Sequence, residues 1–147
     1  MILETQNEKE TRTFGKKFAK QLKGGEILAL SGDLGSGKTV FTKGLALQLG
    51  IKETITSPTF ILMKIYPLPP GLSFRYLAHF DLYRLKEKEI SYQEFTDYLG
   101  KEDGVCVIEW AEKIKKYLKR FGNKVIWIQF QHLHLDKRKI IIKRQSK

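Results

Sequence analysis

The stretch SGDLGSGKTVFTKG, residues 31–44, constrains the fold of this chain more than any other. It places four glycines in fourteen residues, and glycine is used where the backbone turns tightly or approaches another group closely. Residues 32–39, which we call the glycine loop, fit the pattern G-x-x-x-x-G-K-[ST]. The apolar run EILALS precedes this loop, and the amphipathic run KTVFTKGLALQLG starts at residue 38. Strand, glycine loop and helix are therefore predicted in the order that a phosphate-binding loop requires.

The chemistry of such a loop depends on its backbone and on two side chains. Its N–H groups point at phosphate oxygens, and the helix that follows presents its positive end to them. Lys38 is placed to neutralise the β- and γ-phosphate oxygens, and the hydroxyl of Thr39 is a ligand for Mg²⁺. The glycine loop is thus predicted to bind a nucleoside triphosphate.

Two acidic residues are candidates to complete this site. Glu109 follows the apolar run VCVI, and Asp81 ends the run RYLAHFD. Ligands of parallel α/β sheets lie beyond the carboxyl ends of the strands, so both acids are expected beside the loop. His79 lies two residues before Asp81 and should face the same side of its strand. One acid is expected to hold the metal and the other to orient the attacking water, and the sequence leaves open which does which.

The segment SPTF, residues 57–60, follows the predicted helix after a short turn. Pro58 disfavours helical backbone before it. Thr59 is placed to bring its hydroxyl to Mg²⁺ or to the γ-phosphate, as switch loops do. The alternative is an ordinary junction between a loop and a strand.

Helical and strand patterns alternate along the rest of the chain. This alternation predicts an α/β fold in one domain, residues 1–147, of the three-layer P-loop NTPase type. Its central sheet is expected to be mostly parallel, with antiparallel additions at the proline-rich pair and at the C-terminal strands. Beyond the elements that flank the glycine loop, helices are expected at 8–22, 89–100 and 111–122, and strands at 60–66, 73–83, 104–110, 124–130 and 138–143.

The net charge of +11 is confined to the end of the chain. Residues 113–147 hold 12 of the 27 Lys and Arg residues and one acid, Asp136, while the first 112 residues hold 15 bases and 15 acids. Such an excess favours a positive face for an acidic partner, such as RNA or nucleotide phosphates, over a merely solvated surface.

Cys106 is the only cysteine and lies inside an apolar run, so it is expected to be buried in a protein of a reducing compartment. No apolar run approaches the length of a membrane span, and the first ten residues, MILETQNEKE, are too acidic for a signal peptide. A cytoplasmic protein is predicted.

Four motifs, in this order and with these spacings, resemble the TsaE family: GDLGSGKTVFTKGLA, SPTF, HFDLYRL and VIEWAEK. Members of that family are bacterial P-loop ATPases that act in the formation of tRNA threonylcarbamoyladenosine. The resemblance covers most of the chain and implies ATP and Mg²⁺ as cofactors. It implies that Thr39 and Glu109 hold Mg²⁺ and that Asp81 activates or positions water. The implied catalytic residues are Lys38, Asp81 and Glu109, and the implied nucleotide contacts are Thr11, Gly35, Ser36, Gly37, Lys38, Thr39, Val40, Asp81 and Glu109.

The resemblance also implies partner proteins. These are TsaD, which transfers the threonylcarbamoyl group to adenosine 37 of tRNA, and TsaB, its scaffold. The chain would then hydrolyse ATP slowly alone and faster with these partners, and would reach tRNA only through the complex, with no membrane involved.

Two other functions fit part of the pattern. One is a small P-loop kinase, in which Asp81 deprotonates an acceptor hydroxyl. The other is an ATP-dependent RNA-binding module that uses the basic C-terminal region with Tyr117, Phe121 and Trp127, although their spacing favours core packing. A GTPase is disfavoured because the N-K-x-D pattern is missing: Val125 and Ile126 follow the Asn-Lys pair.

Overall fold

The computed structural model describes residues 1–56 and 63–147. The segment SPTF, residues 57–60, lies outside the described residues, so its predicted role stays a prediction. Short 3₁₀ helices carry the label η. In chain order the elements are β1 (Ile2–Thr5), α1 (Glu8–Ala19), β2 (Ile27–Ser31), α2 (Lys38–Gln48), β3 (Met63–Pro67), β4 (Tyr76–Asp81), η1 (Glu87–Glu89), α3 (Gln93–Thr96), β5 (Gly104–Glu109), η2 (Ala111–Ile114), α4 (Lys115–Leu118), η3 (Lys119–Lys124), β6 (Val125–His132) and β7 (Arg138–Arg144).

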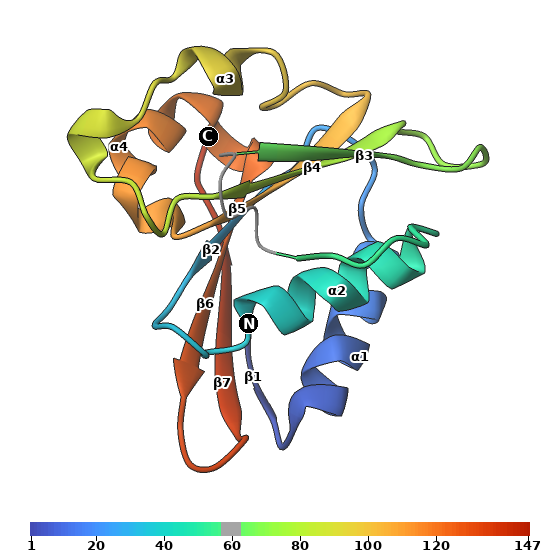
Figure 1. Cartoon of the computed structure of the whole chain (residues 1–147), viewed down its shortest axis with the longest axis vertical. Coiled ribbons are helices and arrows are strands. Elements are labelled where there is room, and N and C mark those ends of the chain that lie inside the picture. Colours follow the sequence, from blue (N-terminus) through green and yellow to red (C-terminus); the bar gives the residue numbers. More distant parts are fainter. Residues whose placement is uncertain (57–62) are drawn as a thin grey trace.

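The seven strands of the described ranges form one sheet in the order β1-β7-β6-β2-β5-β4-β3 (Figure 1). The central strands β6, β2, β5 and β4 pair in parallel, whereas β1, β7 and β3 join antiparallel. This sheet confirms the predicted parallel centre with antiparallel additions. β1 was not predicted, because four residues are too few to show an alternating pattern.

Helices cover both faces of the sheet, which confirms the predicted three-layer α/β fold. α1 and α2 lie on one face, and α3, η2 and α4 lie on the other (Figure 1). Along β2 the side chains alternate between these layers: Leu28 and Leu30 join the core under α1 and α2, and Ile27 and Ala29 join the second core. Because β2 is buried on both faces, its sequence is a continuous apolar run.

The predicted helix at 89–100 is wrong in extent, and the one at 111–122 is not a continuous α-helix. The first contains the four residues of α3 and only the last residue of η1, and the second is divided into η2, α4 and η3. Lys113 explains part of the division, because its ammonium donates to the carbonyls of Leu82, Tyr83 and Leu85 at 2.7–2.8 Å. These bonds tie the start of the segment to the loop after β4, and Ile114 then leaves helical geometry with φ −122°.

Residues that the sequence assigned to the interior are found there. Cys106 is buried, and its thiol donates to the carbonyl of Tyr98 at 3.3 Å. Burial raises the pKa of this thiol. Tyr117, Phe121 and Trp127 all pack in the second core, which confirms the prediction of core packing for these aromatic residues.

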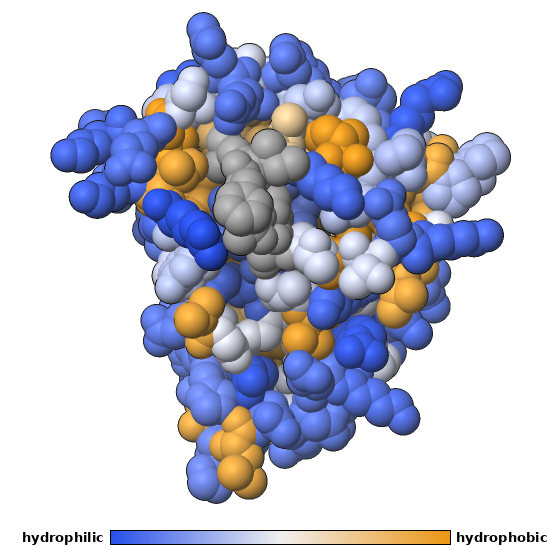
Figure 2. All heavy atoms as spheres, in the orientation of Figure 1, coloured by the Kyte–Doolittle hydropathy of each residue, from blue (hydrophilic) through white to orange (hydrophobic). Residues whose placement is uncertain are grey.

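The face seen in Figure 2 is mostly hydrophilic, with hydrophobic side chains in scattered patches, one of them at its lower end. This end is the hairpin between β6 and β7, where Leu133 and Leu135 are exposed. In the parts of the chain that the structure describes, no helix has the length and apolar character needed to cross a membrane.

Candidate functional site

The glycine loop connects β2 to α2 at the carboxyl edge of the parallel strands. Gly32, Gly35 and Gly37 have φ angles of 136°, 75° and 111°, in the region that side chains disfavour. A Cβ on Gly32 would also lie 2.4 Å from the carbonyl oxygen of Phe130. No side chain of residues 1–56 or 63–147 caps the start of α2, so the N–H groups of its first turn are placed to receive an anion.

Lys38 is buried beneath this loop. Its ammonium donates to the carbonyl of Gly32 and, at 3.0 Å, to that of Asp33. It also lies 4.2 Å from the ring centroid of Trp110, which adopts a left-handed conformation directly after β5. Burial lowers the pKa of Lys38, and the charge of Glu109 opposes that effect. The result is a desolvated cation held by neutral groups, which suits an incoming anion.

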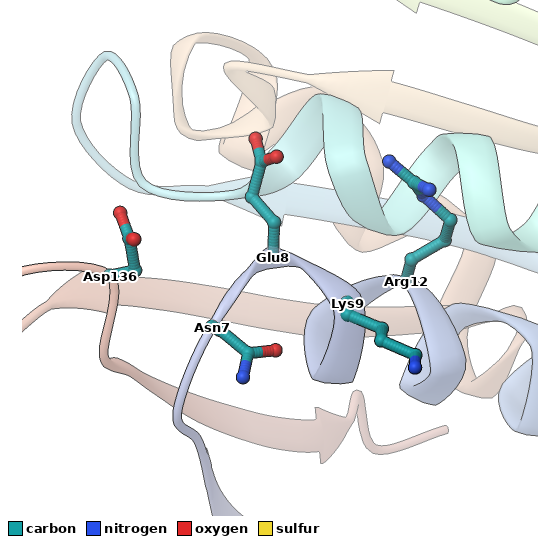
Figure 3. A pocket seen from close by; sticks show the side chains of 5 residues that line it. All are labelled: Asn7, Glu8, Lys9, Arg12 and Asp136. Carbon is teal, nitrogen blue, oxygen red and sulfur yellow. The ribbon is translucent and has the colours of Figure 1, made fainter.

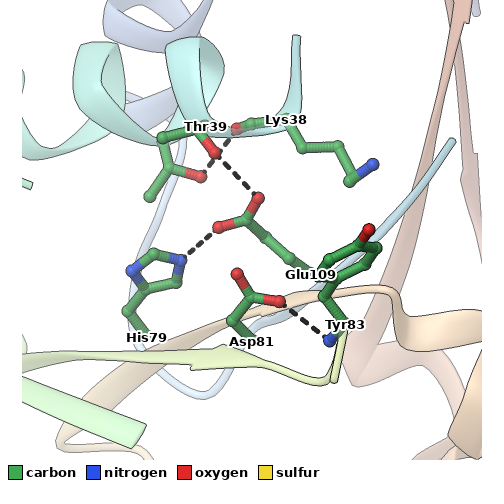
Figure 4. A network of polar contacts seen from close by, with 7 residues as sticks. Lys38, Thr39, His79, Asp81, Tyr83 and Glu109 are labelled. Carbon is green, nitrogen blue, oxygen red and sulfur yellow. Dashed lines mark hydrogen bonds and ion pairs between the residues drawn. The ribbon is translucent and has the colours of Figure 1, made fainter. Parts of the chain in front are cut away.

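The structure brings the two predicted acids together. Asp81 and Glu109 end the parallel strands β4 and β5 and are direct partners in the register. The carboxylate of Glu109 accepts from the hydroxyl of Thr39 at 3.0 Å and contacts His79 Nε2 at 2.5 Å (Figure 4). The carboxylate of Asp81 accepts from the backbone N–H of Tyr83 at 3.0 Å.

The residues at this edge fit Mg²⁺ in its usual form. The Thr39 hydroxyl and the Glu109 carboxylate are adjacent oxygen donors, and Mg²⁺ commonly takes one or two such ligands together with water and substrate phosphates. Within residues 1–56 and 63–147, no group of three His, Cys, Asp or Glu side chains could hold a metal alone. The donor set therefore suits a cation that arrives with phosphate.

The remaining predicted contacts surround the loop. Thr11 of α1 is buried, and its hydroxyl bonds to that of Thr5 at 2.7 Å. Its methyl group would be 3.5 Å from a Cβ placed on Gly37, so Thr11 packs against the glycine loop. Ser36 is buried within the loop, and Val40 is half-buried in the first turn of α2. Whether each of these residues contacts a nucleotide stays a prediction.

Three contacts could not be foreseen from the sequence. The strand pattern puts His79 on the side of Asp81 but does not indicate its contact with Glu109, and nothing in the sequence indicates that Trp110 covers Lys38. Arg138, at the start of β7, donates to the carbonyl of Gly35 at 3.0 Å. Nothing near Arg138 in the sequence indicates this contact, because it depends on how the β6–β7 hairpin folds back.

A pocket of about 520 Å³ lies at the start of α1, next to the β6–β7 hairpin. Figure 3 shows the carboxyl groups of Glu8 and Asp136 on the side of the pocket that faces the loop. The pocket is near the glycine loop because two lining residues, Arg12 and Asp136, are close in sequence to residues that touch the loop. Thr11 packs on the loop, and Arg138 donates a hydrogen bond to it. The lining residues are Asn7, Glu8, Lys9, Arg12 and Asp136.

Comparisons with known proteins agree on one family. The family model described as "Threonylcarbamoyl adenosine biosynthesis protein TsaE" matches residues 5–140. The chain is 38% identical over 145 residues to a protein of Rickettsia typhi named tRNA threonylcarbamoyladenosine biosynthesis protein TsaE, covering 95% of this chain and 92% of that one. A Bacillus subtilis protein of the same name is 40% identical over 122 residues, covering 78% of this chain and 68% of that one. The crystal structure of Bacillus subtilis YdiB superimposes with a TM-score of 0.74 at 31% identity, covering 99% of this chain and 86% of that one.

Proposed function

Because this chain belongs to the TsaE family, we propose that it is a Mg²⁺-dependent ATP hydrolase that serves tRNA threonylcarbamoyladenosine formation. The names of its relatives support the pathway, and the geometry of the glycine loop supports the reaction. We propose that it acts with TsaD and TsaB, and that hydrolysis permits repeated turnover of that transferase complex.

One observation carries the proposal. The glycine loop meets the uncapped start of α2 next to Lys38, and the Thr39 hydroxyl lies 3.0 Å from the carboxylate of Glu109. The loop thus combines donors for phosphate with oxygen ligands for the cation that accompanies it.

Each residue then has a defined role. The N–H groups of the loop bind phosphate oxygens, and Lys38 exchanges its carbonyl partners for the β- and γ-phosphates. Thr39 and Glu109 hold Mg²⁺, which when bound neutralises the charge that develops on the phosphates. Asp81, in register with Glu109, accepts a hydrogen bond from the attacking water and orients it.

The pocket beside the loop is proposed to take the adenosine part of ATP. Thr11, which packs against the glycine loop, precedes Arg12, which lines this pocket. The carboxyl groups of Glu8 and Asp136 face the loop side of the pocket (Figure 3), and a carboxylate suits the exocyclic amino group of adenine as a hydrogen-bond acceptor.

Partner proteins are proposed to set the rate. Among the described residues, two basic side chains have hydrogen bonds to the glycine loop, those of Lys38 and Arg138. Both donate to backbone carbonyls of the loop. A partner that orders the loop or supplies a further positive charge would stabilise the transition state, and an arginine in such a role is worth about 10³- to 10⁵-fold in rate.

The test is to measure phosphate release from ATP with and without TsaB and TsaD, alongside threonylcarbamoyladenosine formation over many turnovers. We expect slow hydrolysis by the chain alone, faster hydrolysis with both partners, and repeated product formation only while ATP is hydrolysed. Product formation at full rate with a non-hydrolysable ATP analogue would contradict the proposal.

The alternative of a small kinase makes a different prediction for the same site. With γ-labelled ATP and candidate nucleosides or sugars, a kinase transfers the label to an acceptor. A hydrolase releases the label as inorganic phosphate whatever acceptor is present.

A further inference from the structure

The two oxygens of the Glu109 carboxylate are held by different parts of the fold. Oε1 accepts from the Thr39 hydroxyl of α2 at 3.0 Å, and Oε2 lies 2.5 Å from Nε2 of His79 of β4 (Figure 4). The side chains of His79 and Glu109 are 0% and 3% exposed. The contact between His79 and Glu109 is therefore closed to water, whereas the contact with the half-buried Thr39 lies at the rim of the site.

The direction of the contact with His79 follows from the groups involved. A carboxylate only accepts, so the imidazole must donate through its Nε2–H. Nε2 carries a proton in the imidazolium ion and in one neutral tautomer, and the contact selects these forms. A short, buried hydrogen bond to a carboxylate is strong, so this contact fixes the orientation of the Glu109 carboxylate.

Nucleotide binding should affect the two contacts of Glu109 differently. If Thr39 becomes a metal ligand, as the proposed function requires, its hydroxyl oxygen points a lone pair at the cation, and the geometry of its contact with Glu109 has to change in that exchange. His79 has no such second role, because it lies within β4, opposite Val107 in the register with β5, and is fully buried. Its contact with Glu109 can therefore persist through the exchange.

We propose that His79 is the positioning residue of this site, holding Oε2 of Glu109 so that Oε1 faces the cation beside Thr39. This inference rests on the proposed function of the glycine loop. His79 itself touches neither metal nor nucleotide in this role. It limits rotation of the carboxylate, which would otherwise have several orientations of similar energy.

The surroundings of Nδ1, the second ring nitrogen, support the view that His79 serves the site and not the packing of the core. Nδ1 is buried and has no hydrogen-bond partner among the described residues. An unpaired buried polar atom costs free energy, so an apolar residue of similar size would serve packing better. The hydrogen bond from Nε2 to Glu109 is the interaction that a histidine makes here and an apolar residue could not make.

Two substitutions separate the nitrogens. The side-chain nitrogen of Gln is as many bonds from Cα as Nε2 of His, whereas that of Asn is as many bonds away as Nδ1. His79→Gln should therefore keep a donor at Glu109, and His79→Asn should lose it. Leu77→Val is the matched control, because Leu77 is buried two residues earlier on the same face of β4.

The measurement is the affinity for Mn²⁺ in the presence of ADP, followed by electron paramagnetic resonance of free Mn²⁺, with nucleotide affinity without metal measured in parallel. Loss of an outer-shell partner weakens metal binding by about 10- to 100-fold, so we expect that loss for His79→Asn and a change of at most about threefold for His79→Gln and Leu77→Val. Nucleotide affinity without metal should change little in all three variants.

Several results would overturn the inference. Wild-type metal affinity in His79→Asn, or equal losses in His79→Asn and His79→Gln, would show that the Nε2 contact does not position Glu109. If His79→Asn does not fold, the imidazole ¹⁵N spectrum of the wild-type chain decides: the Nε2–H signal should stay hydrogen-bonded when Mg²⁺ and ADP are added, and its loss overturns the role. A wild-type chain that binds no Mn²⁺ with nucleotide removes the proposed function as well, which distinguishes the two failures.

Discussion

The ammonium of Lys38 has exchanged water for backbone carbonyls of the glycine loop and the face of Trp110. Burial lowers its pKa, so the charged form is less stabilised here than in water. Phosphate oxygens would supply the charge that carbonyls lack. Binding of an anion should therefore stabilise Lys38 as a cation and draw it away from Asp33.

Lys38→Ala should lower ATP hydrolysis in the assembly with TsaB and TsaD by about 10²- to 10³-fold or more, because a positive group at the transferred phosphate is lost. Lys43→Ala, also on α2 but outside the loop, removes the same charge and should leave the rate unchanged. Phosphate release measured for both variants gives the comparison. Equal rates of phosphate release for wild type and Lys38→Ala would show that the glycine loop takes no part in ATP hydrolysis.

Asp81→Asn should retain ATP and slow its cleavage, because an amide keeps the shape of the side chain but is a poor acceptor for the proton of water. The exposed acid Asp97 gives the control Asp97→Asn, which should hydrolyse ATP normally. Equilibrium binding of ATP and single-turnover cleavage separate the two effects. A variant that loses ATP affinity instead would make Asp81 a binding residue.

At the scale of elements, α1 and α2 pack backbone to backbone. A Cβ on Gly44 of α2 would lie 2.1 Å from the carbonyl oxygen of Arg12, and one on Gly15 of α1 would lie 2.3 Å from that of Phe41. The packing of α1 against α2 therefore positions Thr11 next to the glycine loop.

Gly44→Ala tests this packing through the sign of its effect. In a free helix the change stabilises by about 0.5–1 kcal/mol, but here the added methyl group meets the backbone and overpacking costs about 1–3 kcal/mol. We expect net destabilisation by about 1–2 kcal/mol, seen as a Tm lower by several degrees. Gln48→Ala, exposed near the end of the same helix, is the control and should not lower Tm. A more stable Gly44→Ala variant would mean that the helices can separate at no cost.

The extent to which these elements could be predicted depends on how local their causes are. The glycine loop was predictable because strand, loop and helix are consecutive in the sequence, and Asp81 and Glu109 because each ends an apolar run. Strand β1 and the break at 111–122 were not, because pairing with β7 and the bonds of Lys113 join distant segments. The same reason hid the contacts of Trp110 and Arg138 with the loop.

For the whole molecule, the structure divides the basic residues at the end of the chain into two groups. Several are already engaged: Lys137 pairs with Glu4, and Arg138 and Arg144 donate to carbonyls. Neutralising residues 137–139 would therefore disturb the glycine loop as well as the surface charge. The exposed lysines of α4 and the start of η3 are better probes, namely Lys115, Lys116 and Lys119.

If this surface contacts the RNA carried by the partner complex, replacing these three lysines with Gln should weaken tRNA retention and reduce its salt dependence. Each phosphate contact contributes about 0.7–0.9 to the slope of log affinity against log salt, so the slope should fall by about 2–3. The control replaces Lys16, Lys17 and Lys20, which are exposed on or just after α1 and carry the same total charge. Retention of tRNA by the assembly, measured from low to moderate salt, decides between the two surfaces. Identical slopes for both triple variants would assign the charge on α4 to solvation alone, because an RNA contact depends on where the charge lies and not only on its sum.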